Sequence, residues 1–162
     1  MTWAAAGTPP QGRTGDKGWT GDNCLMTSVS DALPSVPAPD ERCPCLSGET
    51  YSACCGKYHS GARNAPTAEA LMRSRYSAFA IRDEAYLLKT WHPSTRPATL
   101  DLDAGLQWRR LDIVETSAGG PLDETGIVRF RAHFRDEAGR GVQEETSRFV
   151  RISGVWLYVD GE

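Results

Sequence analysis

The sequence has no apolar run that approaches the ~20 residues needed to cross a bilayer as a helix, which argues against an integral membrane protein. The first 21 residues also lack the continuous apolar segment of a secretory signal. The net charge is −3, so a broadly basic coat for nucleic acid is excluded, although a local basic patch is not. No membrane partner is indicated, and nothing points directly to a nucleic-acid partner.

Catalytic motifs are missing as well. No serine or cysteine lies in a recognisable nucleophile motif, and there is no glycine-rich phosphate loop. His92 follows Trp91 at the end of the helical region, where we expect it to hydrogen-bond a loop. His133 shares a strand face with Arg129 and Arg131, which is typical of a solvated face, with an anion site as the alternative. The sequence therefore leaves open whether the protein is an enzyme, and it favours one that is not.

A cluster of cysteines is what the sequence does contain. Four of the five cysteines fall within thirteen residues, while Cys24 lies apart from them. The four are Cys43, Cys45, Cys54 and Cys55. Two close pairs separated by a short loop can supply the four tetrahedral ligands of a structural zinc ion.

Two alternatives to a four-cysteine zinc site stay open. The thiols could form disulfides or remain free, although the adjacent Cys54 and Cys55 would bridge each other only with strain. His59 could also replace Cys55 as the fourth ligand. An odd number of cysteines fits a secreted disulfide framework poorly, so we expect a cytoplasmic protein.

The first 40 residues are rich in glycine, proline, serine and threonine, and they present no periodic apolar face. Such composition predicts a disordered leader over residues 1–40. Met26 opens a stretch that reads like a natural start, so residues 1–25 are a candidate upstream extension. The sequence leaves open whether Met1 or Met26 is the natural start.

Two helices are predicted after the cysteines. Thr67 is expected to be the N-cap of a first helix, which carries Tyr76 and Phe79 on one apolar stripe. A second, shorter helix is predicted to start near Asp83. It should end at His92, because the residue before a proline avoids the helical region.

The apolar period changes to two after residue 105, which predicts strands. In the first strand, Leu111 and Ile113 should share one face, with Trp108 and Asp112 on the other. The other predicted strands span 128–135, 142–152 and 155–159, with a hairpin turn at 138–141. Helices followed by a meander predict an α+β fold, with the helices packed on one face of a curved antiparallel sheet.

The stretch Cys-Pro-Cys-Leu-Ser-Gly-Glu-Thr-Tyr-Ser-Ala-Cys-Cys, from Cys43 to Cys55, resembles the SEC-C motif. This motif is the zinc knuckle at the C-terminal end of the SecA translocation ATPase. Leu46 departs from the glycine usual in the motif, and Glu49 departs from the usual lysine. Further segments resemble the bacterial YchJ family, namely Tyr58–Gly61, Ala68–Ala80, Leu87–Pro97, Ser147–Val150 and Trp156–Gly161.

The resemblance covers about residues 41–161 and implies two parts. Residues 41–62 would be a SEC-C zinc knuckle, and residues 63–162 a domain similar to nuclear transport factor two. That fold is a cone of helices against a strongly curved sheet, often with an internal pocket.

Two functions follow as expectations. SEC-C knuckles in SecA contact the SecB chaperone and the ribosome, so the resemblance implies a non-catalytic zinc protein whose knuckle docks a protein or ribosome partner. The alternative is a small apolar ligand, or a substrate, held in the conical pocket of the second part. The candidate pocket residues, which could equally be plain core, are Tyr76, Trp91, His92 and Trp108.

Overall fold

The computed structural model describes residues 35–162. Cys24 and the predicted start at Met26 lie outside this range, and so does the predicted disordered leader over residues 1–40, apart from residues 35–40. Residues before the cysteines are already tied to the domain, because Ser52 donates both its amide and its hydroxyl to the carbonyl of Pro39. No helix in the described range is long and apolar enough to cross a membrane.

Helices precede strands along the chain, as predicted. The helices are α1 (Gly56–His59), α2 (Ala68–Ile81) and α3 (Glu84–Lys89). The strands are β1 (Gln107–Ala118), β2 (Thr125–Asp136), β3 (Gly139–Ile152) and β4 (Val155–Gly161). They form one antiparallel sheet in the order β1-β2-β3-β4. The α+β prediction is confirmed.

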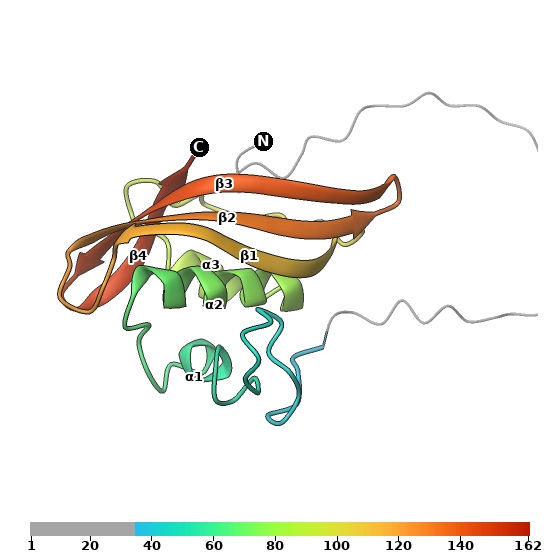
Figure 1. The fold of residues 1–162 in the computed structure, drawn as a ribbon, viewed down its shortest axis with the longest axis horizontal. Helices are drawn as coiled ribbons and strands as arrows, with labels where there is room; N and C mark the ends of the chain where they lie inside the picture. Colours follow the sequence, from blue (N-terminus) through green and yellow to red (C-terminus); the bar gives the residue numbers. More distant parts are fainter. Residues whose placement is uncertain (1–34) are drawn as a thin grey trace, which may run out of the picture.

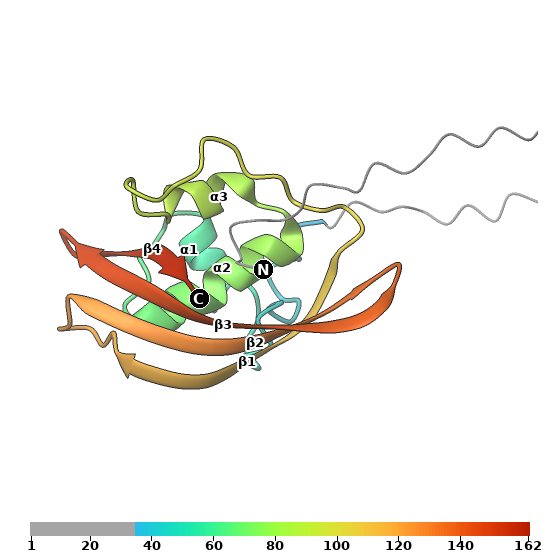
Figure 2. The same ribbon diagram turned by 90° about the horizontal axis from the view of Figure 1, so that it is seen from above.

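The molecule has three layers. The sheet curves around α2 and α3, which lie against its concave face (Figures 1 and 2). The cysteine-containing loops and α1 pack on the opposite side of α2 (Figure 1). Helix α2 is therefore covered on both sides, which explains why ten of its fourteen residues are buried.

Both predicted helix starts are confirmed by their caps. The hydroxyl of Thr67 accepts a hydrogen bond from the amide of Ala70 at 3.1 Å, at the first turn of α2. The carboxylate of Asp83 accepts one from the amide of Tyr86 at 3.0 Å, at the first turn of α3. Each cap satisfies an amide that has no partner within the helix.

A buried arginine joins α2 to α3 and β4. The guanidinium of Arg75 lies between two aromatic rings, 5.0 Å from the ring centre of Trp91 and 4.5 Å from that of Tyr158. It donates to the carbonyl of Leu87 and to the hydroxyl of Thr90, both at 2.8 Å. Burial lowers the pKa of Arg75 to about 10, so the group stays charged at neutral pH.

A bulge in β1 changes the faces that simple alternation predicts. Trp108 is paired with Phe134, and the next paired residue of β1 is Arg110, opposite His133. Arg109 is the extra residue. One extra residue reverses the alternation, so Trp108 turns to the concave face.

The prediction that Trp108 and Asp112 share a face was wrong for this reason. The indole of Trp108 meets three other rings edge-on at the concave side, those of Tyr76, Phe79 and Phe134. Asp112 lies on the outer face, where His133 donates to its carboxylate at 2.8 Å.

The β2–β3 hairpin is also tighter than predicted. Its turn is formed by Glu137 and Ala138, and β3 begins at Gly139 rather than near Val142. Gly139 has a φ of 131°, a conformation that glycine adopts readily, and its amide donates to the Asp136 carboxylate at 3.0 Å. The pairing therefore continues to the end of both strands.

We expect Arg75→Ala to lower the free energy of unfolding by about 3 kcal/mol or more, because it opens a cavity and removes two buried hydrogen bonds. Urea denaturation followed by tryptophan fluorescence would measure the loss. The matched control is Arg73→Ala on the same helix, whose partly exposed i,i+4 pair with Glu69 should contribute less than about 1 kcal/mol. Equal effects in the two variants would contradict the structural role of Arg75.

Candidate metal centre

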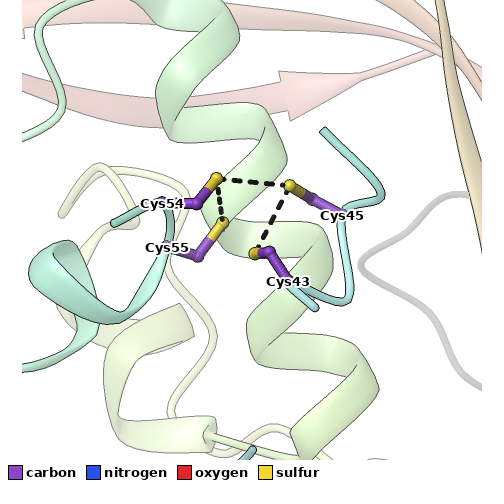
Figure 3. Close-up of side chains that lie close together, drawn as sticks. All are labelled: Cys43, Cys45, Cys54 and Cys55. Atoms are coloured by element: carbon purple, nitrogen blue, oxygen red, sulfur yellow. Dashed lines mark hydrogen bonds between the residues drawn. The ribbon is translucent and has the colours of Figure 1, made fainter. Parts of the chain in front are cut away.

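The four clustered cysteines converge on one point beside α2 (Figure 3). Their sulfur atoms all lie within 4.8 Å of one another. The sulfur of Cys45 is 3.5 Å from that of Cys43 and 3.5 Å from that of Cys54, which is 3.8 Å from that of Cys55. None of the four is in a disulfide.

These separations fit a tetrahedral metal ion. With Zn–S bonds of ~2.3 Å, the edges of a regular sulfur tetrahedron measure roughly 3.8 Å. The separations of 3.5 and 3.8 Å are close to that length and far longer than a disulfide bond. The four side chains could therefore hold a metal without a large rearrangement.

His59 does not compete for the fourth position. Its Nδ1 accepts from the hydroxyl of Tyr51 at 2.8 Å, and its Nε2 donates to the carbonyl of Ser74 at 2.9 Å. Because both ring nitrogens have partners, the imidazole serves as a link between the cysteine region and α2. Burial lowers the pKa of His59, which favours this neutral form.

The loop that follows Cys43 is shaped by two residues with positive φ. Arg42 pairs with Thr50 in a short antiparallel bridge, which closes the loop. Within it, Leu46 has a φ of 55° and Gly48 a φ of 95°. The left-handed conformation at position 46 is the physical reason why glycine suits this position in the motif.

Hydroxyl groups donate to the sulfur atoms from outside the cluster. Ser77 of α2 donates to the sulfur of Cys55 at 3.2 Å and lies 3.7 Å from that of Cys43. The hydroxyl of Ser47 lies 3.2 Å from the sulfur of Cys54. Such donors stabilise the negative charge that four thiolates would carry.

The sequence offered no signal for Ser77. Ser77 is 22 residues beyond Cys55 and belongs to no motif, so only the packing of α2 against the cluster reveals it.

Hydrogen bonds among the thiols distribute their protons unequally. The pKa of Cys45 falls well below its usual range through the contact with Cys43, and that of Cys54 falls to about 6 through the contact with Cys55. In turn the pKa of Cys43 rises to about 11 through Cys45, and that of Cys55 is raised, chiefly through Cys43. Four thiolates therefore require a cation among them.

The cysteine cluster is part of the core. Cys43 and Cys55 are each 1% exposed, and they belong to the same buried cluster as Leu71 and Met72 of α2. The imidazole of His59 also packs on the Tyr86 ring, with centroids 4.5 Å apart. The domain boundaries at 41–62 and 63–162 stay a prediction, but residues on both sides of them share one buried interface.

The candidate pocket residues lie in two places. Tyr76 and Trp108 are in contact, with ring centres 6.0 Å apart. Trp91 is buried against Tyr158, at 4.9 Å between ring centres. The side chain of His92 meets the Ser94 hydroxyl at 2.6 Å, which is the loop contact expected of it. Two surface hollows, of about 530 and 330 Å³, are lined by other residues, so the internal pocket stays a prediction.

Comparisons with known proteins agree with this arrangement. Residues 67–161 match the family described as "YchJ, middle NTF2-like domain", and residues 41–57 match the SEC-C motif. A UPF0225 protein of Streptomyces avermitilis is 52% identical over 133 residues, which are 82% of this chain and 92% of the relative. One from Corynebacterium glutamicum is 54% identical over 122 residues, 75% of this chain and 97% of the relative.

Two solved structures share the fold. A SEC-C motif containing protein from Rhodopseudomonas palustris matches with a TM-score of 0.66 and 35% identity, over 74% of this chain and 96% of that one. Another, from Psychrobacter arcticus, matches with a TM-score of 0.63 and 30% identity, over 75% of this chain and 82% of that one.

Removing the hydroxyl in Ser77→Ala should weaken metal binding by about tenfold, because the thiolate of Cys55 loses its donor from α2. Competition with a chromophoric chelator would measure the change. Ser60→Ala is the control, because the Ser60 hydroxyl donates to the Lys57 carbonyl, away from the sulfur atoms. A metal affinity unchanged in Ser77→Ala would show that this contact does not support the site.

Proposed function

The chain belongs to the UPF0225 (YchJ) family, and from this premise we propose that it is a zinc-stabilised interaction protein whose SEC-C knuckle docks a protein or ribosome partner. The single observation that carries the proposal is that the knuckle has one buried side and one exposed side. Its sulfur atoms are held against α2, while every residue of the loop 46–50 is exposed.

Zinc suits the donor set best. Four thiolates in a tetrahedral arrangement are typical of structural zinc, and the ion would stabilise the fold around it. Because all four positions would be filled by cysteine, no position is left for a water or a substrate, so catalysis at the metal is not expected. A thiolate site of this kind needs reduced cysteines, which supports a cytoplasmic location.

The exposed loop is the part of the knuckle that can meet a partner. Leu46 is an apolar side chain that is 50% exposed on a loop closed by the bridge at Thr50. A loop already held in one conformation loses little entropy when it docks. Glu49 adds negative charge next to Leu46, and the chain as a whole carries −3. This charge favours a protein surface over ribosomal RNA phosphates.

One zinc ion per chain should be found by elemental analysis of protein purified without chelators. Zinc affinity should fall as the pH is lowered, because the ion competes with protons for the thiolates. The loss should be steepest below the ordinary thiol pKa of ~8.5, since all four cysteines must give up their protons. Protein that contains no metal and keeps reduced thiols would contradict the assignment of zinc.

Replacing Leu46 by glycine should separate docking from folding. The φ of 55° is strained for leucine, so Leu46→Gly should leave the free energy of unfolding unchanged or raise it by up to about 1 kcal/mol. At the same time, co-sedimentation with ribosomes or retention on a purified protein partner should fall by about tenfold, because the apolar contact is lost.

The matched control for docking is Leu122→Ser. Leu122 is 95% exposed in the loop between β1 and β2, outside the knuckle. Its replacement should leave retention unchanged. If Leu46→Gly retains the partner as well as the unaltered chain does, the knuckle loop is not the docking element.

A further inference from the structure

The outer end of the β2–β3 hairpin carries a hollow of about 530 Å³ that is unrelated to the cysteine cluster. The hairpin projects past the end of α2 (Figures 1 and 2), so the helices leave this part of the sheet uncovered. Four arginines and one histidine line the hollow, and no carboxylate lines it. The basic residues are Arg109, Arg110, His133, Arg135 and Arg140.

Two of these arginines face each other without compensation. Arg135 and Arg140 are directly opposite in the antiparallel pairing of β2 and β3. Like charges in this position are destabilising. Neither guanidinium has a hydrogen bond or ion pair with any residue in the range 35–162. This pair of like charges is therefore unfavourable for stability, and neither the packing nor the turn of the hairpin requires arginine at these two positions.

The other arginines on this face of β2 and β3 have carboxylate partners. Arg129 and Arg131 donate to the same carboxylate, that of Glu144, at 2.5 and 2.8 Å. Arg148 donates to the carboxylate of Asp160 at 2.6 Å. On this face of β2 and β3, the arginines without a carboxylate partner are thus confined to the hairpin end.

The remaining basic side chains are held in place around the pair. Arg109, the bulged residue of β1, donates to the side-chain oxygen of Gln107 at 2.6 Å. Arg110 and His133 both donate to the carboxylate of Asp112, at 2.7 and 2.8 Å. These contacts reduce the conformational freedom that the side chains would lose when a ligand binds.

An apolar surface accompanies the cations. Val142 is 55% exposed and lines the hollow on the outer face, whereas the half-buried ring of Phe134 packs against Trp108 on the concave face. Gly141 allows that ring to lie across β3, because a Cβ at this position would come within 2.3 Å of the Phe134 ring. A ligand in the hollow would meet guanidinium groups and the aliphatic side chain of Val142 together.

We propose that this hollow binds a small organic phosphate of about nucleotide size, with Arg135 and Arg140 as its principal phosphate ligands. The guanidinium fork matches two phosphate oxygens at once. The volume of about 530 Å³ falls within the range of roughly 300–1,000 Å³ that small-ligand sites occupy. The site goes beyond the docking function and does not depend on it.

A long nucleic-acid strand fits this face less well. The carboxylates of Asp112 and Glu144 lie in the next charged row of the sheet, opposite Arg131 and directly beyond the hollow. They would repel a phosphate backbone that continued along the strands, and the chain carries a net charge of −3. A compact ligand, which does not extend along the strands, avoids both of these sources of repulsion.

The test is isothermal titration calorimetry of the zinc-loaded full chain with pyrophosphate and with adenosine diphosphate, at low and at physiological ionic strength. Binding should be detected with both, and more tightly with adenosine diphosphate, because its base can contact the side chain of Val142. Arg135→Gln and Arg140→Gln should each weaken binding by about tenfold or more, since each removes a charged fork. The control Arg148→Gln should stay within about twofold, because that group is neutralised by Asp160.

A measurement of fold integrity accompanies the titration. Because the two opposed charges repel, the melting temperature of Arg140→Gln should stay the same or rise, so lost binding cannot be attributed to unfolding. Absence of binding by both probes, equal losses in Arg140→Gln and Arg148→Gln, or citrate bound as tightly as pyrophosphate would each overturn the proposal. Binding only to oligonucleotides, and more tightly with length, would overturn it in favour of RNA.

Discussion

The burial of α2 on both sides is the constraint from which the rest of the architecture follows. A helix enclosed in this way must satisfy its polar side chains inside the protein, and it does so in opposite directions. Arg75 reaches toward α3 and β4 and is enclosed by Trp91 and Tyr158. Ser77 reaches toward the cysteines and donates to Cys55. The two polar groups connect α2 to the layers on either side, so the metal centre and the sheet share one core.

This coupling bears on what the metal centre can do. Four buried or partly buried thiolates around one ion would form a closed site, whose geometry would serve folding and the presentation of the loop around Leu46. Function is therefore expected at the surface of the molecule. Two surface features are distinguished by their chemistry, namely the exposed knuckle loop and the arginine-lined hollow at the β2–β3 hairpin.

On the outer face of the sheet, most arginines of β2 and β3 are paired with carboxylates on neighbouring strands. Arg129 and Arg131 share the carboxylate of Glu144 across the strands, whereas Arg135 and Arg140 lie opposite each other without a carboxylate partner. Exposed ion pairs contribute little stability, but an uncompensated pair of like charges has an energetic cost. This opposed pair, at one end of a face whose other arginines have carboxylate partners, is the observation from which the binding site is inferred.

Sequence alone was sufficient for features that depend on local chemistry. The spacing from Cys43 to Cys55 predicted the cluster, and Thr67 and Asp83 predicted the helix starts, because ligand spacing and N-capping involve residues near one another in the chain. The switch from a helical to a strand period predicted the α+β class.

Tertiary structure decided what depends on register and on distant packing. Ser77 meets Cys55 only because α2 packs on the knuckle. Arg109 shifts Trp108 to the concave face, and Arg135 meets Arg140, only once β1, β2 and β3 are paired. A single inserted residue exchanges the two faces of a strand, and no local pattern in the chain marks where that insertion falls.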